Sequence, residues 1–139
     1  MAAVQPYVHF NGTAEEAFTF YKKAFGTEFS NLQRYKDIPS ELHVNQSPDG
    51  ERILHVSLPI GGGTVLLGSD VPADFEKVKG DNFFVSIQAE SEEEAKRLYA
   101  ALSEGGVILM PLEKTFFASW FGMFVDKFGT RWMVNCDPE

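Results

Sequence analysis

A local pattern that occurs twice constrains the fold of this 139-residue chain more than any other feature. Thr13 and Ser91 are each followed three residues later by a glutamate, which is the spacing of a helix N-cap and its acidic partner. An apolar stripe of helical period follows each cap, and glycines end both stripes, at Gly26 and at 105–106. The two patterns lie 78 positions apart. We therefore predict two equivalent helices within an internal duplication.

Strand-like segments surround both predicted helices in the same order. Each helix is preceded by one short segment of β character and followed by three more, and the last two of each half read as a hairpin. The predicted strands are 7–10, 28–35, 53–60 and 64–69 in the first half and 83–89, 107–110, 120–125 and 131–136 in the second. The fold class predicted is α+β, with two βαβββ modules whose mixed sheets form a cup that can hold a ligand.

The domain prediction is one domain, 1–139, made of a first module at 4–70, a linker at 71–82 and a second module at 83–139. The first half is 12 residues longer than the second, and we assign the excess to a loop at 37–52 that is rich in turn-forming residues and includes His43.

Composition narrows the classes of partner. A net charge of -8 argues against nucleic acid or an anionic membrane as the main partner. No segment of about 20 apolar residues occurs, and the first residues lack a basic n-region, so we expect a cytoplasmic protein. The single Cys136 excludes an intrachain disulfide. The chain is rich in aromatic residues, with thirteen Phe, four Tyr and two Trp. Such large apolar rings are expected to be buried in the core, to line a ligand cavity or to form a subunit interface. We also expect a homodimer.

Alternation along the strands predicts which side chains face the cup. In the first half these include Tyr7, His9 and His55, and in the second half they include Phe84 and Met133. The aromatic side chains at 116, 117 and 120 are expected at the mouth of the cup, with packing in the core or at a dimer seam as the alternative. The predicted ligand-binding residues are Tyr7, His9, His55, Phe84, Trp120 and Met133.

His55 is the candidate catalytic residue. A histidine on a central strand that faces a cavity can accept a proton, donate a hydrogen bond or bind as a lone ligand near neutral pH. The alternative is that it only satisfies a neighbouring carbonyl or hydroxyl. Asp126 is expected to organise its turn through hydrogen bonds to the backbone.

Several motifs resemble the vicinal oxygen chelate superfamily, which includes glyoxalase I, extradiol dioxygenases and the bleomycin and fosfomycin resistance proteins. The chain is most similar to the PhnB-like branch, whose members often bear the label of a 3-demethylubiquinone methyltransferase. The residues that support this resemblance are 10–17 with 20–21, 53–56 with 68–70, and 115–117 with 121–122, 126–129 and 132–135.

The resemblance implies up to four metal ligands, from His, Gln or Glu on the first and last strands of each module. The corresponding positions here hold Gln5 or His9, Leu67, Phe84 and Met133. Apolar side chains do not bind a hard cation, so we expect neither the usual metal site nor another cofactor. A divalent metal at a rearranged site near His9 and His55 stays open as an alternative.

We therefore expect a protein that binds a small, partly apolar organic molecule, and whether it is an enzyme is left open. The alternatives are a metal-assisted lyase, isomerase or dioxygenase around His55 and His9, and a protein that assembles with a partner through its aromatic last strands. Methyl transfer is not expected, because the glycines at 61–63 fall in a predicted hairpin and not between a parallel strand and a helix.

Overall fold

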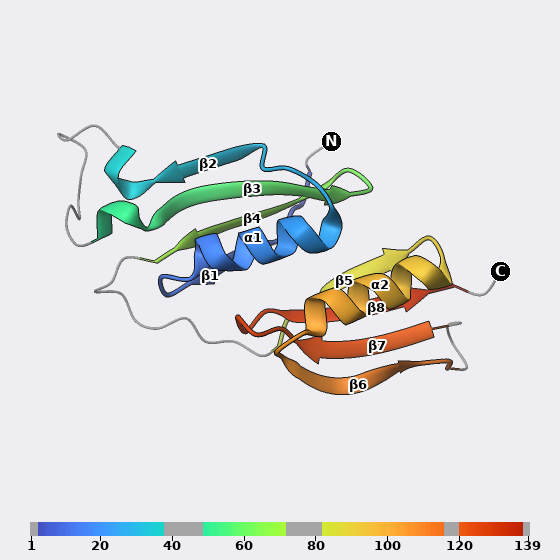
Figure 1. Ribbon diagram of the computed structural model, residues 1–139. Coiled ribbons are helices and arrows are strands. Elements are labelled where there is room, and N and C mark those ends of the chain that lie inside the picture. The colour runs from blue at the N-terminus through green and yellow to red at the C-terminus, as the bar shows by residue number, and fades with distance from the viewer. Residues whose placement is uncertain (1–2, 38–48, 72–81, 116–119, 138–139) are drawn as a thin grey trace. The chain divides into compact units, whose positions relative to one another are not determined.

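The computed structural model describes residues 3–37, 49–71, 82–115 and 120–137. It divides into two compact units, Met1–Lys79 and Gly80–Glu139, and each is considered by itself. The first contains β1 (Tyr7–Phe10), α1 (Ala14–Phe25), β2 (Asn31–Arg34), the 3₁₀ helices η1 (Tyr35–Asp37) and η3 (Asp49–Glu51), β3 (Ile53–Gly61) and β4 (Thr64–Asp70). The second contains β5 (Val85–Ala89), α2 (Glu92–Ser103), β6 (Val107–Glu113), β7 (Trp120–Val125) and β8 (Arg131–Cys136) (Figure 1).

Both units build the same four-stranded sheet. The strand orders are β1-β4-β3-β2 and β5-β8-β7-β6. In each unit the first strand pairs in parallel with the last, and the remaining pairs are antiparallel. The predicted α+β fold with one βαβββ arrangement in each half is confirmed.

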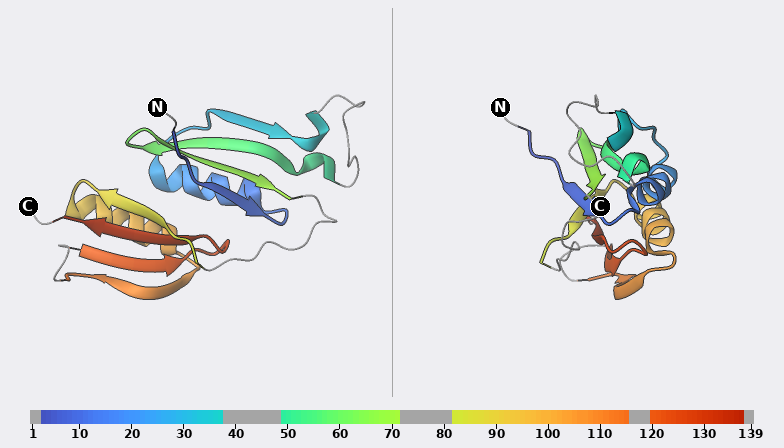
Figure 2. Two further views of the ribbon diagram at one scale, coloured as in Figure 1. Left: turned by 180° about the vertical axis from the view of Figure 1, so that it is seen from behind. Right: turned by 90° about the vertical axis from the view of Figure 1, so that its left-hand side faces the viewer.

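Each helix covers one face of its own sheet, as the right-hand view of Figure 2 shows. On α1, Ala17, Phe18 and Tyr21 are completely buried, and on α2 the buried side chains include Leu98 and Leu102. The apolar stripes of the sequence are the faces that pack on the sheets. Among the described residues of each unit, no helix packs on the opposite face of its sheet.

The helix boundaries follow the predicted signals, with one exception. The Ser91 hydroxyl accepts a hydrogen bond from the Glu94 amide at 3.1 Å, which is the predicted N-cap contact of α2. The Glu94 carboxylate accepts one from the Glu90 amide, one residue before the cap, at 3.0 Å. Gly26 ends α1 with a positive φ of 70°. Thr13 occupies the N-cap position of α1, but its side chain makes no capping hydrogen bond.

The turn between β7 and β8 is organised as predicted. Asp126 Oδ1 accepts hydrogen bonds from the amides of Phe128 at 2.8 Å and Thr130 at 3.0 Å. Its Oδ2 accepts a third, from the indole Nε1 of buried Trp132 at 2.9 Å.

Some predicted segments differ from the observed elements. The predicted strand 28–35 is shorter as β2, 83–89 is shorter as β5, and 107–110 is longer as β6. Most of the loop 37–52, with His43, and most of the linker 71–82 lie outside the described residues, as do Phe116 and Phe117.

Both helices are 12 residues long. Across the described ranges, no helix combines the length and the apolar composition needed to cross a bilayer.

Candidate functional site

The helix-free face of the first sheet brings together three predicted site residues, Tyr7, His9 and His55. The Tyr7 hydroxyl lies 3.4 Å from His55 Nδ1. The Tyr7 ring centroid is 5.1 Å from that of His9 and 5.9 Å from that of His55. Tyr7 is 43% exposed and His55 is half-buried, so all three side chains form one partly accessible aromatic and polar cluster.

Strand register explains why these residues share a face. Val8 pairs with Gly68, which in turn pairs with Val56, and Gly68 lies directly beneath the Phe18 ring of α1. That row therefore faces the helix. Because neighbouring side chains of a strand point to opposite faces, the residues on either side of this row point away from α1.

Two buried serines and one leucine complete this face. Ser69 Oγ lies 3.2 Å from His9 Nδ1. Ser57 is 2.7 Å from the Ser30 hydroxyl, oxygen to oxygen. Leu67 pairs with Tyr7 on one side and with Ser57 on the other. The face thus combines hydroxyl and imidazole groups with an apolar patch.

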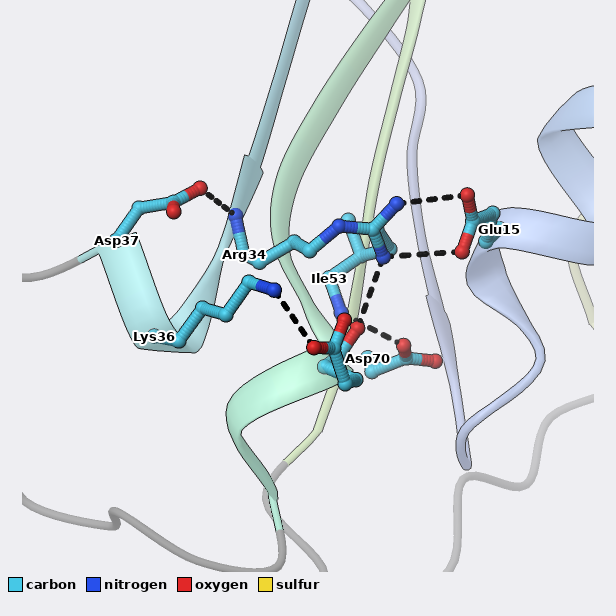
Figure 3. A network of polar contacts seen from close by, with 7 residues as sticks. Glu15, Arg34, Lys36, Asp37, Ile53 and Asp70 are labelled. Carbon is cyan, nitrogen blue, oxygen red and sulfur yellow. Dashed lines mark hydrogen bonds and ion pairs between the residues drawn. The ribbon is translucent and has the colours of Figure 1, made fainter.

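A buried carboxylate at the end of β4 fixes the strand that bears Tyr7 and His9. Asp70 Oδ1 accepts hydrogen bonds from the amides of Gly12 and Ala14, both at 2.9 Å. Its Oδ2 accepts one from the Ile53 amide, also at 2.9 Å (Figure 3). Asp70 therefore joins the β1–α1 turn and the start of α1 to β3. The role of Asp70 was not predicted from the sequence, where 68–70 was only part of a family motif.

Next to Asp70, an ion-pair network ties α1 to β2 (Figure 3). The Arg34 guanidinium donates two hydrogen bonds to the Glu15 carboxylate, at 2.9 Å and 2.7 Å. These hydrogen bonds lower the pKa of Glu15 below its ordinary value. Arg34 also donates to the Glu51 carbonyl, and Lys36 pairs with the Glu51 carboxylate at 2.6 Å. The carboxylates of this corner are engaged in structural contacts.

The helix-free face of the second sheet carries a different set of side chains. Met133 pairs with Ser86, and Gln88 with Asn135. The Arg131 guanidinium lies 5.5 Å from the centroid of the Phe84 ring, a distance typical of a cation–π contact. Within the described part of the chain, Asn135 Oδ1 is buried without a hydrogen-bond partner.

Trp120 is not brought to that face. It pairs with buried Cys136, and its ring centroid lies 4.6 Å from the Nζ of Lys96 on α2. Lys114 lies on the same ring at 5.7 Å. The indole therefore sits on the helix-covered side of the sheet, where two ammonium groups contact it.

Comparison with known proteins identifies the family. A family model described as 3-demethylubiquinone-9 3-methyltransferase matches residues 2–135. The chain belongs to this family. The crystal structure of protein PA1353 from Pseudomonas aeruginosa is 34% identical with a TM-score of 0.89, over 100% of both chains.

Two further solved structures share the fold of this chain. A protein from Bacillus cereus titled as a putative 3-demethylubiquinone-9 3-methyltransferase, PhnB protein, is 24% identical with a TM-score of 0.79, over 97% of this chain and 99% of that one. A glyoxylase/bleomycin resistance protein/dioxygenase domain from Frankia sp. EAN1pec is 12% identical with a TM-score of 0.69, over 100% and 94%. The predicted glyoxalase/bleomycin resistance fold and the resemblance to PhnB-like proteins are confirmed.

The metal site that this fold implies does not match the residues present. The would-be ligand positions hold Leu67, Phe84 and Met133, and Gln5 Oε1 already accepts a hydrogen bond from the Val65 amide at 2.8 Å. Over the residues that the structure describes, no three His, Cys, Asp or Glu side chains gather closely enough to hold an ion. These residues do not fit the superfamily's metal centre.

Proposed function

We propose that this protein binds a small, partly apolar organic molecule on its helix-free sheet faces. Each face is a candidate site by itself, with Tyr7, His9 and His55 as contact residues in the first unit and Phe84 and Met133 in the second. The observation that supports this most is the cluster of Tyr7 with two histidines, which remains partly exposed on a face that α1 leaves open. Ligand sites typically combine apolar and aromatic groups with a few precisely placed polar groups.

Methyl transfer, which the family description names, is not part of this proposal. Gly61, Gly62 and Gly63 have positive φ and join the antiparallel strands β3 and β4, whereas a nucleotide-type cofactor is cradled between a parallel strand and a helix. The start of α1 is also engaged, because the Gly12 and Ala14 amides donate to Asp70. A helix start whose amides already bind a carboxylate is not available to a cofactor phosphate or carboxylate.

A second candidate function is an enzyme that works around His55 and His9 as a lyase, isomerase or dioxygenase. The contact between the Tyr7 hydroxyl and His55 favours it, because a hydroxyl that orients an imidazole ring prepares it for proton transfer. Metal analysis of protein purified without chelator separates the two functions. One tightly held divalent ion per chain would favour the metal-assisted enzyme over simple binding.

The binding proposal is tested by equilibrium dialysis of the protein against a cell metabolite extract, followed by mass spectrometry of the retained molecules. We expect His55→Ala and Tyr7→Ala each to reduce retention of the enriched molecule about ten-fold, through lost polar and aromatic contacts. Both side chains are partly exposed, so the melting temperature should change little. Thr19→Ala, on the exposed side of α1, is the matched control. No enrichment, or full retention by both variants, would contradict the proposal.

A cytoplasmic location and a homodimer are also parts of the proposal. The support for self-association is strand β6 of the second unit, an edge strand with four consecutive apolar residues that are all exposed.

A further inference from the structure

We infer that the molecule bound on the first face carries an anionic oxygen, such as a carboxylate, attached to a small apolar body. This inference rests on the proposed binding function and narrows the class of ligand. Three features of the face lead to it: the hydrogen bonds that orient the two imidazoles, the charges of the surrounding side chains, and the apolar surface beside them.

The first feature is the direction in which each imidazole can donate. His55 Nδ1 faces the Tyr7 hydroxyl, and His9 Nδ1 faces the Ser69 hydroxyl. A hydroxyl that donates to Nδ1 places the proton of the neutral ring on Nε2. In this tautomer each ring presents an Nε2–H donor, and among the described residues no hydrogen bond is made by either Nε2. Two such N–H donors on one face favour an oxygen acceptor.

The second feature is charge. The chain has 20 acidic residues against 12 Lys and Arg, so its net charge opposes the approach of anions. On this face the side chains at the paired positions of β1, β4 and β3 are neutral hydroxyl, imidazole and apolar groups: Tyr7, His9, His55, Ser57, Leu67 and Ser69. The β2 residues in the same rows, Asn31 and Gln33, are neutral amides. Two carboxylates near these strands in the sequence, Asp70 and Glu15, are already engaged by groups of the protein. Asp70 accepts three backbone amides and Glu15 pairs with Arg34.

A carboxylate ligand therefore finds donors on this face without a like charge beside them. A cationic ligand finds no carboxylate on the described part of this face. The charge pattern selects against cations as well as for anions.

The third feature is the apolar patch next to the donors. Leu67 lies between Tyr7 and Ser57 in the sheet, and the Tyr7 ring is accessible on the same side. An aromatic or branched aliphatic body can cover both while its anionic group reaches the imidazoles. Benzoate is the simplest probe with these two parts.

The test uses protein dialysed against EDTA, so that any affinity comes from the chain alone. Binding of benzoate, benzyl alcohol and benzylammonium is measured by calorimetry or by NMR titration. We expect benzoate to bind about ten-fold more tightly than benzyl alcohol, which is the difference between a charge-assisted and a neutral hydrogen bond, and benzylammonium to bind most weakly. In Tyr7→Phe, which keeps the ring but removes the hydroxyl, the preference for benzoate should fall about three-fold or more, while Thr19→Ala should keep it.

The outcomes separate this inference from the binding proposal. If benzyl alcohol binds as tightly as benzoate, the face binds small molecules but does not select anions, and only the inference is overturned. If benzoate binds only after Zn²⁺ is added, recognition needs a metal and direct donation by the imidazoles is wrong. A preference for benzoate that persists unchanged in both Tyr7→Phe and His55→Ala would also overturn the inference, because the anion would then be bound elsewhere.

Discussion

Among single residues, Asp70 contributes most visibly to the architecture of the first unit. Asp70 is 2% exposed, and its two oxygens accept hydrogen bonds from three backbone amides, of which those of Ala14 and Ile53 are buried contacts. Its backbone carbonyl accepts a fourth hydrogen bond, from the Tyr35 hydroxyl at 2.9 Å. A buried amide left without an acceptor costs about 1–3 kcal/mol, so this one residue influences the stability of the whole unit.

We predict that Asp70→Asn lowers the free energy of unfolding by about 2–3 kcal/mol. The amide keeps one acceptor oxygen but points an NH₂ group at an amide that now lacks an acceptor. Urea denaturation of the purified variant measures the effect. Asp37→Asn is the matched control, since Asp37 is exposed and accepts a single backbone hydrogen bond from Arg34. An equal decrease in the free energy of unfolding for both variants would show that the buried hydrogen bonds of Asp70 contribute no more to stability than the exposed one of Asp37.

The sequence predicted single-residue roles where the partners are local. The N-cap contact of Ser91 with Glu94 and the turn of Asp126 involve residues two to four positions apart, and both were found as predicted. The cap expected from Thr13 was wrong in its hydrogen bond, because the Thr13 side chain makes none. The first amide of the helix, that of Ala14, donates instead to Asp70, 56 positions away. A contact over that distance depends on the pairing of β1 with β4, which no local motif reveals.

At the level of elements, close packing of α1 on its sheet depends on a position without a side chain. A Cβ built on Gly68 would lie 2.5 Å from the Phe18 ring and 3.1 Å from the Val8 carbonyl. Phe18 is completely buried and also packs edge-on against Phe10 and Tyr21, so the ring has little room to move. Gly68 thereby sets the separation between helix and sheet.

We predict that Gly68→Ala lowers the free energy of unfolding by about 2 kcal/mol or more, through overpacking. The double variant Gly68→Ala with Phe18→Leu should recover part of that loss relative to Phe18→Leu alone, because the smaller side chain admits the new methyl group. Chemical denaturation of all three variants gives the coupling energy. Gly50→Ala is the control, since its Cβ meets only the Lys36 Cβ at an ordinary 3.5 Å. Without any recovery in the double variant, Phe18 is not the group that limits this position.

Element type was predictable because both periodicities are strong in this sequence. Strands β1, β7 and β8 have the predicted bounds, and both helices occur where their caps indicated. Strand length was less predictable, because pairing partners decide how far β2 and β6 extend. Trp120 was predicted at the mouth of the cup, whereas its ring contacts the ammonium groups of Lys96 and Lys114.

At the scale of the molecule, the repeated strand order of the two units supports an origin by duplication, and the contents of the two open faces have diverged. The first face holds histidines and hydroxyls, whereas the second holds Met133, Phe84 and Arg131. Sequence alternation predicted which of these residues share a face within each sheet. That these residues bind a ligand is a proposal, because strand alternation predicts which face a side chain lies on but not which molecule it contacts.

We predict that the protein is a homodimer and that Leu109→Lys on β6 converts it to a monomer. Val107, Ile108, Leu109 and Met110 are between 42% and 61% exposed, and a charged side chain in this strand opposes burial against a second copy. Light scattering coupled to gel filtration measures the mass of each variant. Thr19→Lys, on an exposed position of α1, should remain dimeric. A monomeric parent protein would refute the homodimer, and a dimer that survives Leu109→Lys would assign it to another surface.

The parallel pairing of β1 with β4 also has a consequence for the nascent chain. Tyr7 faces Leu67 across that pair, so the strand that bears Tyr7 and His9 has no neighbour until translation has passed the end of β4. Loop closure over such a separation is slow relative to local contacts. On the ribosome, α1 can form early, but the imidazole-bearing face is assembled only after β4 has been translated.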